Sequence, residues 1–426
     1  MRPKNALIIA NIGVLPLMTA FGGLNGDLLQ YYASGYFNLT EAEIGVAIGL
    51  LSFTIPLQFL STQFVRQWGA RRVLLAGYSI RFCLVPLLLV IPALLAQNRI
   101  FGLTLFYALV FTVHLVHVTT FGVAWQPIIR SVTKSSERGG YFGRMRFLFN
   151  GFNLVFFTVL GLVVGEAISP TVFLSIVLLL MAYCMFAFWI VWRQEGLDAG
   201  VVAQPRFREI FSQTKLLWRN LTYRALITIS VLRLPSSLPL FIVYLALIVG
   251  LSAKEISLII ICRAAGMMAG FIVWGEVIRR FGYTKAIVGP LVLLTGISGL
   301  WLLFSIFNHN SLIIIFFGII AMVTAFSHAG LGLGMVTAVH NTAQDENAVV
   351  VLTSFDILDM GLESMMAALM GFYIQATFIT LNDESTQYFF DPYIYFCLGG
   401  AILSGLAIII ANRTLNQSKY PGLKKT

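Results

Sequence analysis

The sequence has 426 residues, of which 58% are hydrophobic and only 11% are charged. Soluble domains carry about 25% charged residues, so one water-soluble core cannot cover this apolar surface, and an ordinary soluble protein is excluded. The net charge of +10 would suit a nucleic-acid-binding protein, but the positions of the basic residues, given below, exclude that class.

Twelve apolar windows follow one another along the chain, separated by short polar segments. About 20 mostly apolar residues in a helix cross the bilayer, and each window is long enough to do so. We therefore predict an all-α membrane protein whose twelve transmembrane helices lie at 7–32, 43–65, 73–96, 102–129, 147–168, 171–192, 222–249, 255–278, 286–307, 311–337, 347–379 and 393–412.

The first window follows Arg2 and Lys4, as the hydrophobic region of a signal peptide would. It is longer than such a region and contains Asn11, Asn25 and Asp27 without a clear cleavage site of small residues. We expect it to be a retained membrane helix.

Basic residues are distributed unevenly between the two sets of connecting segments. Most of them lie at the chain ends and in alternate connections, whereas the opposite set of connections carries only Arg99 and Lys254. Positive charge stays on the cytoplasmic side during insertion. The pattern predicts that both termini are cytoplasmic, in a bilayer that we expect to be a bacterial inner membrane.

A polar segment at the middle of the chain divides it into two parts. We expect an N-terminal six-helix bundle at 1–192, a cytoplasmic linker at 193–221, a C-terminal six-helix bundle at 222–412 and a cytoplasmic tail at 413–426. No extramembrane stretch is long enough for a catalytic domain, and no phosphate-binding glycine-rich loop occurs. We therefore expect neither ATP nor another cofactor.

The two parts share an internal repeat. Six positions recur about 213 residues later: Leu39, Glu43, Ile44, Arg66, Gly69 and Arg72 correspond to Leu251, Glu255, Ile256, Arg279, Gly282 and Lys285. A duplicated apolar unit is typical of secondary transporters, in which the substrate binds between the repeats.

The repeated segments carry a motif. Residues 66–72 and 275–285 resemble the Gly-x-x-x-Asp-Arg-x-Gly-Arg-Arg signature of the major facilitator superfamily. The resemblance implies a transporter with two pseudo-symmetric six-helix bundles and a cytoplasmic gate at the motif loops. The gate residues that we carry over are Arg66, Gly69, Arg71, Arg72, Arg279, Arg280 and Gly282.

The chain departs from the family motif at its acidic position, where Arg66 and Arg279 stand, and Thr62 replaces the first glycine of the motif. Asp356 and Asp359 lie at the expected cytoplasmic start of the eleventh helix. We therefore predict a charge-swapped gate contact between Arg66 and one of these acids. The alternative is that these carboxylates only contact water at the end of the helix.

Polar residues inside membrane helices are expensive and point to function. In the family, helices one, four, seven and ten line the central cavity, and most of the unusual polar residues here fall on these helices. The expected substrate and coupling residues are Asn25, Asp27, His114, His117, Trp125, Gln126, Arg233, Arg263, His328 and Glu363.

Alternatives remain open for several of these residues. Arg233 either contacts the solute or coupling ion, or forms a structural salt bridge with an acid such as Asp27 or Glu363. His114 and His117 lie on one helical face and either exchange protons or contact the solute, or form a structural hydrogen-bonded pair. We expect no metal site there.

The sequence therefore predicts a secondary active transporter for a small polar or anionic organic solute, driven by protons or another ion. Buried arginines and histidines favour this solute class, and we expect uptake by a monomer. Proton-coupled efflux of a drug or metabolite is the main alternative. A pore or a receptor without transport would share the fold. A membrane-embedded metal enzyme using Asp356 and Asp359 lacks a second acidic motif.

Overall fold

The structure is a computed structural model, and it describes residues 3–12, 20–21, 27–57, 63–65, 67–122, 124–125, 128, 138–164, 167–194, 218–237, 240–301, 312–342, 348–380 and 392–415. Every regular element in these ranges is a helix, which confirms the all-α class.

Ten helical segments of the described ranges are long and apolar enough to cross a membrane. They are Ala70–Leu89, Arg99–Phe121, Arg144–Val163, Pro170–Trp192, Leu221–Ile248, Ala253–Phe281, Tyr283–Leu300, Ile313–Val339, Ile357–Ala376 and Phe396–Leu415. They overlap the last ten expected windows. The other two windows, 7–32 and 43–65, include residues outside the described ranges, so the count of twelve stays a prediction.

Contacts along the chain define two compact units. Unit 1 contains Met1–Phe207, Leu240–Ser257 and Ala367–Phe372, and unit 2 contains Arg208–Pro239, Leu258–Met366 and Tyr373–Thr426. Two short segments of the second half of the sequence therefore pack with the helices of the first half.

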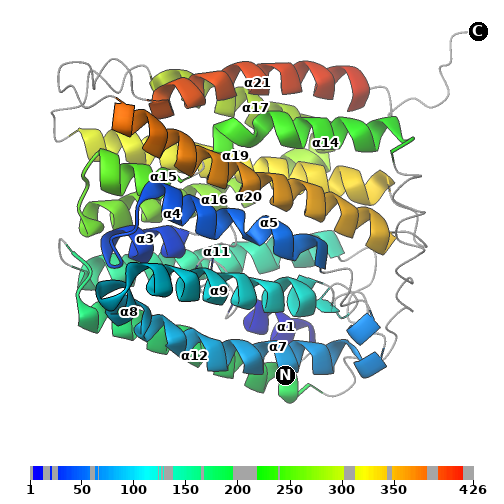
Figure 1. The fold of residues 1–426 in the computed structure, drawn as a ribbon. Coiled ribbons are helices and arrows are strands. Elements are labelled where there is room, and N and C mark those ends of the chain that lie inside the picture. Colours follow the sequence, from blue (N-terminus) through cyan, green and yellow to red (C-terminus); the bar gives the residue numbers. More distant parts are fainter. Residues whose placement is uncertain are drawn as a thin grey trace, which may run out of the picture. The chain divides into compact units, whose positions relative to one another are not determined.

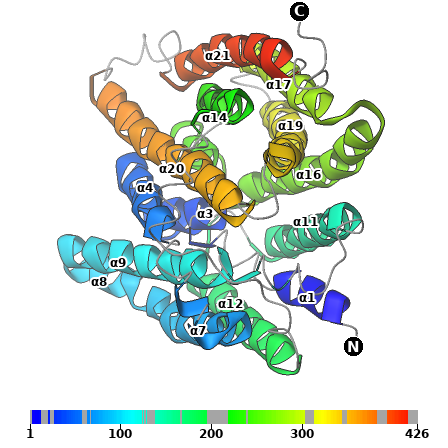
Figure 2. The ribbon, with the colours of Figure 1, turned by 90° about the vertical axis from the view of Figure 1, so that its right-hand side faces the viewer.

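Unit 1 consists of helices of very different length (Figure 1). They are α1 (Pro3–Ile12), α3 (Asp27–Gly35), α4 (Glu41–Gly49), α5 (Leu51–Thr54), η2 (Ile55–Leu57), α7 (Ala70–Leu84), η3 (Val85–Leu89), α8 (Ile91–Gln97), α9 (Arg99–His117), η4 (Val118–Gly122), α11 (Arg138–Val163), α12 (Pro170–Trp192), α15 (Phe241–Val243) and η7 (Tyr244–Ile248). Helix α7 packs along α12, and α8 packs along α9 (Figure 2).

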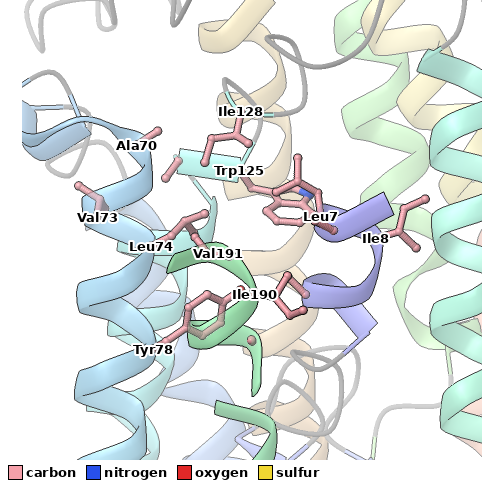
Figure 3. Packing of buried hydrophobic residues seen from close by; sticks show 14 of the residues in the cluster. Leu7, Ile8, Ala70, Val73, Leu74, Tyr78, Trp125, Ile128, Ile190 and Val191 are labelled. Carbon is pink, nitrogen blue, oxygen red and sulfur yellow. The ribbon is translucent and has the colours of Figure 1, made fainter. Parts of the chain in front are cut away.

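The core of unit 1 joins α1, α7 and α12. Leu7 and Leu74 are fully buried, as are Ala124 and Val191, and Trp125 packs among them (Figure 3). Apolar side chains thus hold together helices that are distant in the sequence, as in a soluble core, while Leu162 and other large apolar side chains face outward, where lipid solvates them.

Unit 2 consists of α14 (Leu221–Arg233), η6 (Leu234–Ser237), α17 (Tyr283–Leu300), α19 (Ile313–Thr342), α21 (Pro392–Leu415) and most of α16 (Ala253–Phe281) and α20 (Ala348–Thr380). Helix α17 packs against both α19 and α21, and α14 packs against α21 (Figure 2). Tyr223, Leu291 and Ala407 belong to the buried core that these helices share.

The internal repeat has a structural cause at the start of two helices. Thr40 and Glu43 form a capping box on α4, in which each side chain bonds the other residue's backbone N–H. At the start of α16, Ser252 and Glu255 make the same two reciprocal bonds. The repeated glutamates therefore satisfy helix-terminal N–H groups that lack partners within the helix.

The repeated glycines also share one structural role. Gly69 and Gly282 have φ angles of 83° and 82°, a left-handed conformation that favours glycine. Their N–H groups bond the carbonyls of Val65 and Ile278. Each glycine lies immediately before the next helix, α7 or α17, so it ends one helix and reverses the chain into the following one.

Within unit 1, α4 and the middle of α20 cross at backbone contact. A Cβ atom at Gly371 would lie 2.6 Å from the carbonyl oxygen of Glu41 and 3.0 Å from the Cα of Gly45. Small residues permit such close helix crossings in membranes. Any larger side chain at this crossing must push the helices apart.

We predict that Gly371→Leu opens the crossing. In a background without the native cysteines, Ala42→Cys should react slowly with a maleimide because Ala42 is buried at 8% exposure. Adding Gly371→Leu should accelerate the reaction severalfold. Gly405→Leu is the control, because a Cβ at Gly405 meets no atom within 4 Å. An unchanged rate in the Gly371→Leu protein would contradict the close crossing.

Candidate functional site

The candidate site in unit 2 lies where an apolar helix is interrupted. Helix α14 begins at the Asn220 cap, whose side chain accepts bonds from two backbone N–H groups, and ends at Arg233. Pro235 follows in the 3₁₀ turn η6. Interrupted membrane helices are characteristic of binding sites in transporters because they free backbone groups near the midplane.

Helix α21 holds this interruption in place. The hydroxyls of Ser236 and Ser404 are 2.7 Å apart and both are buried. A Cβ at Gly400 would lie 2.9 Å from the backbone nitrogen of Ser236. The absence of a side chain at Gly400 therefore lets α21 approach the backbone of the broken segment.

Arg233 forms an ion pair with Asp359 of α20. Its Nη2 donates to Asp359 Oδ1 over 2.6 Å, with side-chain exposures of 8% and 21%. The hydroxyl of Ser230, three residues before Arg233, donates to the same carboxylate oxygen. Both donors are thus on one face of α14. An ion pair with little solvent contact depends on such extra hydrogen bonds, because desolvation offsets much of the Coulomb attraction.

Three more titratable or charged residues surround this pair. Glu363, one helical turn after Asp359, interacts electrostatically with Arg233 and with Arg263 of α16. His328 of α19 interacts with both arginines. We call Arg233, Arg263, His328, Asp359 and Glu363 the charge network. Its residues come from four helices, α14, α16, α19 and α20, within unit 2.

The charge network is balanced in charge but not in hydrogen bonds. Two arginines face two carboxylates, so the formal charge is zero when both acids are ionised and His328 is neutral. Among the described residues, however, Arg233 Nε and His328 Nε2 are buried without a hydrogen-bond partner. Buried polar atoms normally have partners, so these two atoms are exceptions within the described residues.

A second polar cluster lies in unit 1 where α9 ends. Thr54 Oγ1 is 2.6 Å from His114 Nδ1, and Arg81 Nη1 of α7 is 3.1 Å from His117 Nδ1. The ring of His117 stacks on Phe121 at 5.2 Å between centroids, and Phe121 stacks on Trp125 at 4.7 Å.

The hydrogen bonds assign opposite tautomers to the two histidines. Arginine only donates, so His117 Nδ1 accepts and its ring proton is on Nε2. The Thr54 hydroxyl donates to the carbonyl of Leu51, so His114 Nδ1 must carry the proton that it shares with Thr54. With these tautomers, His114 Nε2 carries no proton and His117 Nε2 carries one.

A π-helical turn, η4, follows His117 directly. It brings Thr120 so close to α7 that a Cβ at Gly77 would lie 2.2 Å from Thr120 Oγ1. Such turns inside α-helices are frequent at functional sites. Here the turn and Gly77 let α9 approach α7, so that Arg81 reaches His117.

The other expected site residues have varied surroundings. Asp27 is buried as the first residue of α3, in unit 1.

The expected gate residues contact their own or neighbouring helix ends. Arg71 donates to the carbonyls of Val191 and Trp192 and so caps the end of α12, whereas Arg72 is exposed. Arg279 and Arg280 both pair with Glu276 of their own helix.

The expected gate contact stays a prediction. Arg66 is outside the described residues, as are Asn25 and Gln126, and the side chain of Asp356 is not described either. Asp359, the other expected partner of Arg66, makes its described ion pair with Arg233.

Four contributors were absent from the sequence-derived site. Ser230 could have been found, because it is a polar residue one turn before Arg233. Arg81 is a charged residue within an apolar window, a signal that was visible. Tyr78 and Cys184, which interact electrostatically with Arg81, look like ordinary packing residues in the sequence.

Comparison with known proteins agrees with this helical architecture and identifies a multi-pass membrane transporter rather than an enzyme. The sequence matches the Major Facilitator Superfamily over residues 10–358, so the chain belongs to this family. No curated protein matches the sequence.

Solved structures share the fold over nearly the whole chain. The nucleoside transporter NupG has a TM-score of 0.67 at 12% identity, with 99% of this chain and 100% of NupG covered. A bacterial homologue of the iron transporter ferroportin, in an outward-facing state, has a TM-score of 0.60 at 15% identity, with 97% and 100% covered. At these identities the similarity concerns the fold alone.

We predict strong energetic coupling between Arg233 and Asp359. Asp359→Leu or Arg233→Met alone leaves a buried charge without its partner and should cost about 3 kcal/mol, whereas the double variant should recover most of this loss. Unfolding midpoints of the purified proteins in detergent, combined in a double-mutant cycle, measure the coupling.

The control for this cycle is the exposed pair between Arg280 and Glu276. Glu276→Gln should change the midpoint little, since solvent screens exposed pairs. Additive effects of the Arg233 and Asp359 substitutions would contradict the ion pair.

Proposed function

We propose that this family member is a proton-coupled importer of small polar or anionic organic solutes that works by alternating access. The observation that carries the proposal is the charge network, because charged residues within membrane helices are kept mainly where they serve transport. Arg233 Nε and His328 Nε2, which lack protein partners in the described residues, are the proposed hydrogen-bond donors or acceptors for the solute.

The charge balance supplies a coupling mechanism. With Asp359 and Glu363 ionised, the network is neutral and attracts an anion weakly. Protonation of Glu363 leaves one net positive charge beside Arg233 and Arg263, and an anionic solute then restores neutrality. Proton and anion thus favour each other's binding, and reciprocal coupling of this kind is what symport requires.

The proposed arrangement in the membrane follows from the charge distribution of the sequence. Both termini face the cytoplasm of a bacterial cell, and residues 193–221 connect a bundle at 1–192 to a bundle at 222–412. The excess of basic residues on the cytoplasmic connections supports this orientation. We propose that one chain is the transporting unit, because the whole charge network comes from a single chain.

The solute class is tested with the purified protein. Organic acids, amino acids, sugars, nucleosides and drugs are first screened for thermal stabilisation, and the hits are assayed for counterflow in proteoliposomes. We expect a polar or anionic hit whose labelled form accumulates transiently against unlabelled solute inside. Arg233→Ala should abolish both effects, and Arg224→Ala, at an exposed position of the same helix, is the control.

Two results would contradict this proposal. A pore would equilibrate the labelled solute without a transient excess. Stabilisation by lipophilic cations alone, unchanged by Arg233→Ala, would favour efflux of such cations instead.

Proton coupling is tested by Glu363→Gln, which imitates the protonated acid. We expect uptake driven by a pH gradient to fall to passive equilibration, while counterflow, which needs no net proton movement, continues. Gradient-driven accumulation by Glu363→Gln at the wild-type level would exclude Glu363 as the coupling residue.

A further inference from the structure

The charge of Arg81 is not compensated within the described residues. Arg81 is 1% exposed, and the titratable groups that interact with it are neutral: Tyr78, Cys184 and the histidine His117. None of the described carboxylates is among them. In this respect Arg81 differs from Arg233, which has Asp359 at 2.6 Å.

The hydrogen bonds of Arg81 are also incomplete. Its Nε donates to the carbonyl of Gly77 over 3.0 Å, and its Nη1 donates to His117. Its Nη2 is buried without a partner in the described part of the chain, and so is the hydroxyl of Tyr78. The Tyr78 ring lies 4.9 Å from the guanidinium carbon.

Both unpartnered groups can donate hydrogen bonds: Arg81 Nη2 only donates, and the Tyr78 hydroxyl donates or accepts. Cys184, buried on α12, interacts electrostatically with Arg81, and its thiol is a weak donor. An isolated buried cation is costly, and donors without acceptors add to this cost. One small anionic group would neutralise the charge and accept the unused hydrogen bonds at once.

We propose that Arg81, Tyr78 and Cys184 form a binding site for one small anionic group. The group is either a halide ion or the carboxylate of the transported solute. Only the second source rests on the proposed function. All three residues belong to unit 1, whereas the residues of the charge network belong to unit 2.

The test measures binding on the full-length protein in detergent, in a buffer of HEPES and N-methylglucamine that lacks halides and carboxylates. Chloride and acetate are titrated separately, and the unfolding midpoint is followed. We expect a saturable rise of about 2–4 °C. The rise should vanish in Arg81→Met and persist in Arg224→Met, which removes an exposed arginine.

The variants also separate an anion site from a purely structural arginine. In this buffer without halides and carboxylates, Arg81→Met should be at least as stable as the wild type, because it removes an uncompensated charge. Tyr78→Phe keeps the ring and removes one donor, so the half-saturating anion concentration should rise severalfold. If Arg81→Met does not fold, Tyr78→Phe alone distinguishes an anion site from a purely structural arginine.

Competition identifies the source of the anion. If a transported acid displaces chloride, the site takes the carboxylate of the solute; if only halides compete, it takes an inorganic ion. The proposal is overturned if no anion stabilises the wild type, if Arg81→Met responds equally, or if Tyr78→Phe leaves the half-saturating concentration unchanged. Binding is measured without transport, so an inactive transporter that binds anions would refute the proposed function alone.

Discussion

A charge buried among apolar helices needs a partner inside the protein, because lipid provides neither counter-ions nor hydrogen bonds. The ion pair between Arg233 and Asp359 meets this need in unit 2. Pro235 ends α14 just after the arginine, Ser230 supplies a second donor to Asp359, and α21 supports the broken segment through Ser404 and Gly400. The local sequence around the break thus positions the charge of Arg233 beside Asp359. Glu363, Arg263 and His328 extend this pair into a network of two arginines, two carboxylates and one histidine.

Unit 1 also contains a buried arginine, but no described carboxylate compensates its charge. Arg81 is buried, as Arg233 is, yet the titratable groups that interact with it electrostatically are not carboxylates. His117 accepts one of its hydrogen bonds, which fixes the histidine tautomer but adds no negative charge. Arg233 thus has a carboxylate partner within the protein. Arg81 would obtain its negative charge from the proposed anion.

Much of the architecture could be predicted from the sequence because membrane helices are selected by local composition. The apolar windows located ten helices, and the repeated residues indicated a duplicated membrane unit. The physical roles of the repeat became visible only in the structure, where Glu43 and Glu255 complete capping boxes and Gly69 and Gly282 adopt left-handed angles.

The candidate site was harder to predict because it depends on which helices lie opposite each other. Arg233, Arg263, His328 and Glu363 were recognisable as polar residues in apolar windows, but nothing in the sequence indicates that Asp359 faces Arg233. The contact between Arg81 and His117 depends on the π-helical turn after His117 and on the missing side chain of Gly77. Neither feature has a strong sequence signal, so the sequence does not indicate that Arg81 lies beside His117.

We propose that a proton and a polar or anionic solute move inward together. This coupling is tested by recording the external pH of a weakly buffered suspension of proteoliposomes when a stabilising solute is added, with a potassium shunt to prevent a membrane potential. We expect a rise in external pH that requires the solute and is lost when the bilayer is made permeable to protons. Solute uptake with no change in external pH, or with acidification, would contradict it.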